Sequence, residues 1–204
     1  MNFVGIQESF NDYPDEISII LFTKYCTWNC KNCHNKFNLL ESDILSYDYI
    51  FNYLEESKSL INHVVISGGE CTGEDDILFF VKRLTEKGFY VKIDSNGVNP
   101  KVLNQLLPYL SMVAMDIKED FTNFEKYKRI CRNLTKKEFE SVLESIKILS
   151  DWNKSDRENH KVIFRTTMLD EFIDTEVIKD KLKKYSYSDY IIQKDLTKIG
   201  RDSR

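Results

Sequence analysis

Short apolar runs rich in β-branched residues alternate with amphipathic segments along most of this 204-residue chain. The apolar runs predict strands at 17–23, 63–67, 89–93, 112–117, 162–167 and 189–193. Apolar residues at helical spacing predict helices at 46–59, 74–87, 100–107, 135–152 and 175–185. Strands that alternate with helices indicate right-handed βαβ units and a parallel sheet. Since six units are too few for a closed eight-stranded barrel, we expect an α/β fold, an open partial (β/α)6 barrel with parallel strands; a doubly wound flat sheet is the alternative.

Composition and charge exclude several classes of protein. The formal net charge is −4, and lysines are interleaved with acids, so there is no strong basis for binding a nucleic acid. No apolar run approaches the roughly 20 residues of a membrane helix. Residues 1–15 are too acidic and polar for a signal peptide. No repeat or linker divides the sequence, so we expect one cytoplasmic domain over residues 1–204, with its core at about 17–193 and no membrane partner.

Three of the five cysteines, Cys26, Cys30 and Cys33, lie within eight residues of one another. An odd number of cysteines in a reducing compartment argues against a disulfide framework and favours metal binding or redox chemistry. Three thiolates can hold three corners of an iron–sulfur cube, and the missing fourth leaves one iron open to a small molecule. Zinc is the alternative, with His63 or His160 as a fourth ligand, although the spacing differs from that of paired zinc knuckles.

Residues suited to binding or catalysis recur at or just beyond the carboxyl ends of the predicted strands. They are Cys26, Gly69, Asp94, Asp116 and Arg165. Since these ends converge on one face of a parallel α/β fold, we expect the five residues to line one pocket. Period-two geometry also places Lys118 on the same side as Asp116.

Each of these motifs also has a simpler explanation. Gly68-Gly69-Glu70 can be a turn followed by a helix cap, and 94–97 can be a plain Asn-Gly turn. Asp116 and Lys118 can form an exposed ion pair. The functional interpretation is that two glycines let the backbone approach a ligand, while the following carboxylate pairs with an ammonium group. Arg165 lies in an apolar run and needs a partner, for which a carboxylate of a ligand or of the protein would serve.

The spacing Cys-x3-Cys-x2-Cys after the first predicted strand, with Gly-Gly-Glu after the second, resembles the radical S-adenosylmethionine (SAM) superfamily. The resemblance implies a [4Fe–4S] cluster on Cys26, Cys30 and Cys33, whose open iron binds the amino and carboxylate groups of SAM. One electron from the cluster then cleaves SAM to methionine and a 5′-deoxyadenosyl radical. The cofactors carry this chemistry, and we expect no catalytic side chain beyond those that bind them.

Within the superfamily, residues 5–193 resemble the glycyl-radical-enzyme activating proteins, in particular those of anaerobic ribonucleotide reductase. The matching segments are 9–14, 22–23, 33–35, 66–70, 94–97, 115–118 and 164–167. The SAM-binding residues implied are Gly68, Gly69, Glu70, Asp94, Asn96, Asp116, Lys118 and Arg165. The reaction implied removes a hydrogen atom from a backbone glycine of a partner glycyl radical enzyme, expected to be anaerobic ribonucleotide reductase. An electron donor such as flavodoxin or ferredoxin is implied as well.

The resemblance also suggests how SAM is shared among these residues. Gly68-Gly69-Glu70 resembles the segment that holds the amino group of the methionine moiety, and Asp94 matches an aspartate that helps to hold SAM. A cation at Lys118 could meet the carboxylate of SAM, and Asp116 could meet the ribose hydroxyls.

Three residues depart from the family pattern. Asn32 replaces an aromatic residue, Cys71 a proline and Asp15 a glycine. Cys131 has no cysteine near it in the sequence, so no auxiliary cluster is expected. Two other functions stay open: a radical SAM enzyme that modifies a small molecule or peptide, in modified-nucleoside or peptide-modification biosynthesis, and a non-catalytic zinc-binding module.

Overall fold

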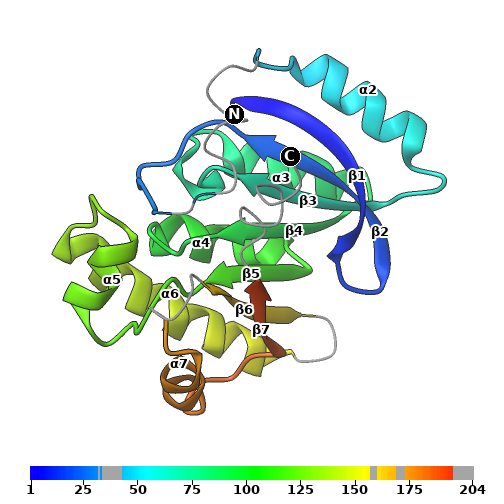
Figure 1. The fold of residues 1–204 in the computed structure, drawn as a ribbon. Helices are drawn as coiled ribbons and strands as arrows, with labels where there is room; N and C mark the ends of the chain where they lie inside the picture. Colours follow the sequence, from blue (N-terminus) through cyan, green and yellow to red (C-terminus); the bar gives the residue numbers. More distant parts are fainter. Residues whose placement is uncertain (32, 34–42, 157–159, 169–172, 195–204) are drawn as a thin grey trace, which may run out of the picture. The chain divides into compact units, whose positions relative to one another are not determined.

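The computed structural model describes residues 1–31, 33, 43–156, 160–168 and 173–194. Within them, seven strands form one sheet in the order β1 to β7 (Figure 1). The strands are β1 (Phe3–Tyr13), β2 (Glu16–Thr23), β3 (His63–Gly68), β4 (Tyr90–Ser95), β5 (Met112–Asp116), β6 (Lys161–Met168) and β7 (Asp189–Lys194). The helices are α2 (Tyr47–Ser57), α3 (Ile77–Glu86), α4 (Pro100–Leu106), α5 (Phe124–Ile130), α6 (Lys136–Ser155) and α7 (Thr175–Leu182), with 3-10 turns η1 (Cys71–Gly73) and η2 (Leu107–Tyr109).

The chain divides into two compact units. Unit 1 consists of Met1–Thr27, Asn35–Ser95 and Lys101–Val113, and unit 2 of Trp28–His34, Asn96–Pro100 and Ala114–Arg204. Unit 1 therefore contains β1 to β4 with α2 and α3, whereas unit 2 contains α5, α6, α7, β6 and β7. Strand β5 begins in unit 1 and ends in unit 2.

The core of unit 1 lies on the parallel strands β2, β3 and β4. Ile19 pairs with Val64, which in turn pairs with Val91, and all three side chains are buried. Helix α3 adds Phe80 and Leu84 to the buried set. Each such side chain contributes about 1.5–3 kcal/mol when fully buried, so these apolar runs dominate the stability of the unit.

Strand β1 was not among the predicted strands, and it pairs antiparallel with β2. It forms a long hairpin with β2, shown in blue in Figure 1. Its side chains are mostly exposed or half-buried and its register is interrupted, so it lacks the apolar run of a central strand. Asp15 in the hairpin turn has φ 67°, a left-handed conformation that favours glycine, which explains why a glycine is typical at this position.

Unit 2 is built on α6 and the parallel pair β6 and β7. A capping box between Thr135 and Glu138 starts α6, and Val142, Ile146 and Leu149 form its buried stripe. Helix α5 was not predicted, because it lies in a segment that is polar overall. Tyr127 and Ile130 are nevertheless buried on one face of α5.

The six predicted strands are all present, with ends within two residues of the expected ones. The five predicted helices agree to within three residues. The strand order runs from β1 to β7 and β1 pairs only with β2 in that order, so the described sheet is open. No helix in the described ranges is long and apolar enough to cross a membrane.

Candidate active site

The three clustered cysteines follow β2 and fall in different units. Cys26 is exposed and belongs to unit 1, whereas Cys30 and Cys33 are half-buried and belong to unit 2. All five cysteines of the chain are free thiols. Among the described residues, no three His, Cys, Asp or Glu side chains are already gathered as a metal site. Asn32, His34 and Asn35 lie outside the described residues.

Contacts inside unit 2 hold the cysteine loop against α5 and α6. Trp28 is buried, packs edge-on against Tyr127 at 6.3 Å between ring centroids, and donates a hydrogen bond from Nε1 to Glu138 at 3.2 Å. The backbone N–H of Asn29 donates to Oδ1 of Asn133 at 2.7 Å. One aromatic and two polar contacts therefore anchor the part of the loop that directly precedes Cys30.

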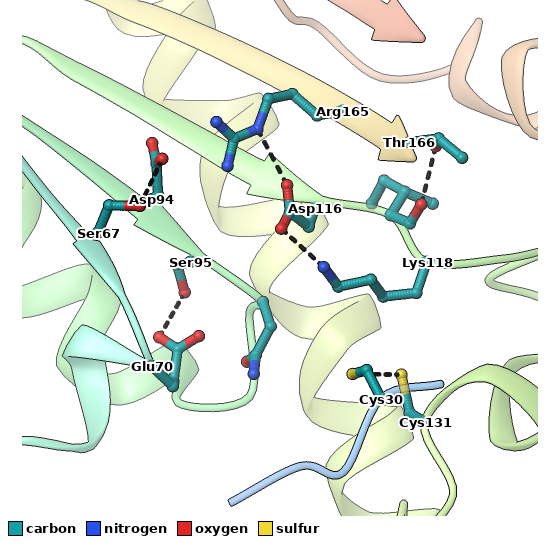
Figure 2. Close-up of polar contacts among 12 residues, drawn as sticks. Cys30, Ser67, Glu70, Asp94, Ser95, Asp116, Lys118, Cys131, Arg165 and Thr166 are labelled. Atoms are coloured by element: carbon teal, nitrogen blue, oxygen red, sulfur yellow. Dashed lines mark hydrogen bonds and ion pairs between the residues drawn. The ribbon is translucent and has the colours of Figure 1, made fainter. Parts of the chain in front are cut away.

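Cys131 lies beside Cys30, a contact that sequence analysis missed. The two sulfurs are 3.6 Å apart (Figure 2), although 101 positions separate the residues. The hydrogen bond between the two thiols lowers the pKa of Cys30 to about 7, against the opposing effect of burial and with further help from the charge of Lys118. Nothing in the sequence connects the two cysteines, so only the fold could reveal this pair.

In unit 1, the Gly-Gly-Glu segment is joined to the end of β2 by its backbone. Gly68 has φ +100°, and the N–H groups of Gly69 and Glu70 donate to the carbonyls of Thr23 and Tyr25 at 2.8 and 2.7 Å. A Cβ on Gly69 would lie 2.1 Å from the carbonyl oxygen of Tyr25, so only glycine fits this position. This turn therefore fixes the chain that leads directly into the cysteine loop.

The carboxylate of Glu70 is buried and hydrogen-bonded within unit 1. Its Oε1 accepts hydrogen bonds from the backbone N–H and the hydroxyl of Thr72, and from the hydroxyl of Ser95 at 2.8 Å (Figure 2). Glu70 thus caps η1, as the simpler explanation of the motif predicted. The cap holds the carboxylate in one orientation.

Asp94 lies near the end of β4 and is also held on both carboxylate oxygens. Oδ2 accepts a hydrogen bond from Ser67 at 2.9 Å, and Oδ1 forms an ion pair with Lys92 (Figure 2 shows the Ser67 contact). Lys92 is only 2 % exposed and was missed, although its spacing of two from Asp94 on one strand places both on the same side.

Cys71, which replaces the usual proline, is fully buried behind Asp94. Its thiol donates to the backbone carbonyl of Asp94 at 3.4 Å, and burial raises the pKa of this thiol well above its ordinary value. A protonated, buried thiol is a poor nucleophile and metal ligand. Cys71 therefore fills space in unit 1.

Asn96 and Gly97 form the turn that follows β4, and they belong to unit 2. Oδ1 of Asn96 accepts from the backbone N–H of Val98 at 3.0 Å, and Gly97 has φ +78°. The hydroxyl of Ser145 on α6 donates to the carbonyl of Gly97 at 2.7 Å. The Asn-Gly turn of the simpler explanation is thus present, and it is fixed to α6.

Asp116, the last residue of β5, carries a carboxylate that bridges two cations in unit 2. Asp116 accepts from Lys118 Nζ at 2.7 Å through one oxygen and from Arg165 Nε at 2.9 Å through the other (Figure 2). Burial alone would favour the neutral acid, but the two cations outweigh it and hold the pKa of Asp116 well below its usual range. Asp116 in turn raises the pKa of Lys118, despite the opposing effect of burial. The sequence predicted that Arg165 has a charged partner, and Asp116 is such a partner, a carboxylate of the protein itself.

The predicted binding residues therefore form two charged groups, one in each unit. The group in unit 1 consists of the carboxylates of Glu70 and Asp94 with the cation of Lys92, and the group in unit 2 consists of the cations of Lys118 and Arg165 with the carboxylate of Asp116. Carboxylates suit a cationic ligand group, and cations suit an anionic one. Cys30 and Cys33 share unit 2 with the second group, whereas Cys26 shares unit 1 with the first group.

We expect the Asp116→Asn substitution to lower the free energy of unfolding at pH 7 by about 1–3 kcal/mol. Asparagine has the same shape but no charge, so both cations would lose the carboxylate that they share. The stabilisation is present above the unfolded-state pKa of about 3.9 and is lost as the pH falls through the lower folded-state pKa. Urea unfolding at pH 7 and pH 3 should therefore show a difference between variant and wild type that shrinks in acid.

The control for this substitution is Asp180→Asn, which removes an exposed aspartate that pairs with Lys183 at 2.9 Å. Because exposed pairs contribute little, this variant should unfold within about 0.5 kcal/mol of the wild type at both pH values. Equal stability of Asp116→Asn and Asp180→Asn would contradict the assignment of a stabilising network to Asp116.

Comparison with known proteins identifies the family. Residues 20–182 match the sequence profile of the radical SAM superfamily. A protein of Methanocaldococcus jannaschii, provisionally named a glycyl-radical enzyme activating enzyme, is 34% identical over 187 residues, covering 89% of this chain and 74% of its own. A second such protein of the same organism is 28% identical over 171 residues, covering 82% of this chain and 62% of its own.

The chain thus belongs to the radical SAM superfamily. It is a radical SAM enzyme, an oxidoreductase whose family uses a [4Fe–4S] cluster and SAM. The crystal structure of Streptococcus suis SuiB bound to SAM has a TM-score of 0.63 and 16% identity, covering 84% of this chain and 39% of that one. These matches confirm the predicted α/β fold, an open partial barrel, and they favour the iron–sulfur interpretation of the cysteines over zinc.

Proposed function

We propose that this radical SAM enzyme activates a glycyl radical enzyme by removing a hydrogen atom from one of its backbone glycines. The observation that carries the proposal is the 34% identity, over 89% of the chain, to a relative named for that activity. We further propose anaerobic ribonucleotide reductase as the partner. A glycine α-radical is delocalised over both neighbouring amides, which makes that residue suited to storing a radical.

The donor set of this chain fits the cluster that the family uses. Cys26, Cys30 and Cys33 offer three thiols, one exposed and two half-buried, and three thiolates leave one iron without a protein ligand. The thiol of Cys71 is fully buried in unit 1, so it does not compete with these three thiols for iron. When bound, the cluster and SAM together supply the radical that removes the hydrogen atom.

Each charged group has its own proposed part in binding SAM. The carboxylates of Glu70 and Asp94 would bind the ammonium group, with the Gly68-Gly69 backbone close to the ligand. The cations of Lys118 and Arg165 would bind the carboxylate, as a guanidinium or ammonium commonly does. Asp116 would orient both cations, and Asn96 would shape the turn after β4.

Three further assignments complete the proposal. Residues 1–204 act as one catalytic domain with a core at about 17–193. The enzyme works in the cytosol and receives its electron from a small donor such as flavodoxin or ferredoxin. The free state of all five thiols is in keeping with a reducing compartment.

The test begins with the protein reconstituted anaerobically with iron and sulfide, reduced, and incubated with SAM. Formation of 5′-deoxyadenosine is expected. Anaerobic ribonucleotide reductase is then added, and a glycyl doublet is expected in the electron paramagnetic resonance (EPR) spectrum. A reductase in which the target glycine is alanine serves as the control and should give no doublet.

The two alternatives give different results in the same experiment. Formation of 5′-deoxyadenosine without a doublet, for every glycyl radical enzyme of the source cell, would favour a radical SAM enzyme that modifies a small molecule or peptide. A protein that binds zinc and leaves SAM intact would overturn the proposal.

A further inference from the structure

The loop around Cys30 and the chain after α5 form a short antiparallel bridge in unit 2. Cys30 and Cys131 are the bridged residues, and the backbone N–H of Lys31 donates to the carbonyl of Ile130 at 2.9 Å. This pattern makes Cys30 and Cys131 a non-hydrogen-bonded pair, in which facing side chains are closest, with about 4.5 Å between Cα atoms. The two sulfurs accordingly lie 3.6 Å apart.

The position of Cys131 is set by elements that do not depend on the cysteine loop. Its backbone N–H donates to the carbonyl of Tyr127 at the end of α5, and its carbonyl accepts from Leu134 at 2.9 Å. Its side chain is fully buried. Cys131 thus presents its thiol to Cys30 from a fixed backbone, whereas Cys30 lies on a loop that has to accommodate a ligand.

We propose that Cys131 is a positioning residue for Cys30, which holds the sulfur of Cys30 in place and donates an S–H hydrogen bond to it when Cys30 binds iron. The inference deepens the proposed function, because it rests on Cys30 as a ligand of the cluster. A hydrogen bond to a thiolate ligand stabilises the reduced, more negative cluster and so raises its reduction potential.

The alternative use of Cys131, as a ligand in its own right, is disfavoured by its surroundings. It is fully buried against the end of α5, and a fourth protein thiolate would occupy the iron that SAM needs. A hydrogen-bond donor beside the ligand leaves that iron open.

The experiment is an EPR-monitored reductive titration of the reconstituted wild type, Cys131→Ala and Cys131→Ser, with Cys71→Ala as the control. The alanine variant is expected to have a more negative midpoint potential than the wild type. The serine variant retains a donor and should recover toward the wild-type value. Cys71→Ala removes an equally buried thiol in the other unit and should leave the midpoint unchanged. Circular dichroism establishes that each variant is folded.

Each other outcome has a distinct meaning. Equal midpoints for wild type and Cys131→Ala would overturn this inference while leaving the proposed function intact. A folded Cys131→Ala that binds no cluster would also overturn it, since Cys131 would then be a ligand. A wild type that binds no cluster would overturn the proposed function and this role together.

The contact itself is tested without iron, in the cluster-free protein treated with diamide. Two facing thiols lose two protons and two electrons to diamide, which becomes the hydrazine, and one disulfide forms. Peptide mass spectrometry is expected to find the cross-link between Cys30 and Cys131 in preference to any cross-link of Cys26 or Cys33. A random distribution of cross-links would show that the pair is not held together.

Discussion

Cys30→Ala is expected to remove the iron–sulfur cluster and, with it, all formation of 5′-deoxyadenosine. Three thiolates are the minimum that holds three irons of the cube, so two would leave the cluster without a stable site. The folded chain should survive, because Cys30 is only half-buried and the loop is anchored through Trp28 and Asn29. Iron content, visible absorbance and a chromatographic assay for the nucleoside measure the effect.

The matched control is Cys71→Ala, which also shortens a cysteine by one sulfur atom but outside the predicted ligand set. It should keep the iron content of the wild type. If Cys30→Ala retained as much iron as Cys71→Ala, the assignment of Cys30 as a ligand would be wrong.

Gly69→Ala is expected to destabilise the protein by about 2–4 kcal/mol and to disrupt SAM cleavage. The new methyl group would lie 2.1 Å from the carbonyl oxygen and 2.6 Å from the carbonyl carbon of Tyr25. These are backbone atoms and cannot rotate away, so the chain between β2 and Cys26 would have to move. The same carbonyl accepts the hydrogen bond from Glu70, and that bond would be lost too.

Gly5→Ala in β1 controls for the change of residue type. Its Cβ would meet the side chain of Phe22 at 3.4 Å, an ordinary contact, so its stability should stay within about 1 kcal/mol of the wild type. Urea unfolding of both variants provides the comparison. Coincident transitions for Gly69→Ala and the wild type would contradict the close approach of the two segments.

The predictability of the fold differed between its centre and its edge. The runs around Ile19, Val64 and Val91 are buried on both sides, so continuous β-branched residues identified β2, β3 and β4. Strand β1 lies at the edge, where one side faces solvent, and its polar sequence carried no such signal. Helix α5 had a weak signal in the spacing of Phe124 and Tyr127 after the cap Asn123, hidden by the charged residues between them.

In the candidate site, features that are local in sequence were predictable, and contacts between distant segments were not. Motifs local in sequence, such as Gly68-Gly69-Glu70, were placed correctly at strand ends, whereas Arg165 lies inside β6 and not at the carboxyl end that was expected. Period-two reasoning related Asp116 to Lys118, and the same reasoning could have related Lys92 to Asp94. Contacts between distant segments, above all Cys30 with Cys131, depend on how α5 meets the cysteine loop. No local sequence pattern predicts the contact between α5 and the cysteine loop.

The buried ion pair of Lys92 and Asp94 orders the Asp94 side chain when the protein folds, so the entropy cost of ordering it falls on folding and not on ligand binding. With Ser67 on its other oxygen, Asp94 has lost its rotational freedom before any ligand arrives. A side chain that is already immobile spares an entropy loss of about 0.5–1.5 kcal/mol at the moment of association. If Asp94 holds SAM as proposed, part of the affinity is therefore stored as preorganisation, so loosening Lys92 would weaken binding even where Asp94 itself is unchanged.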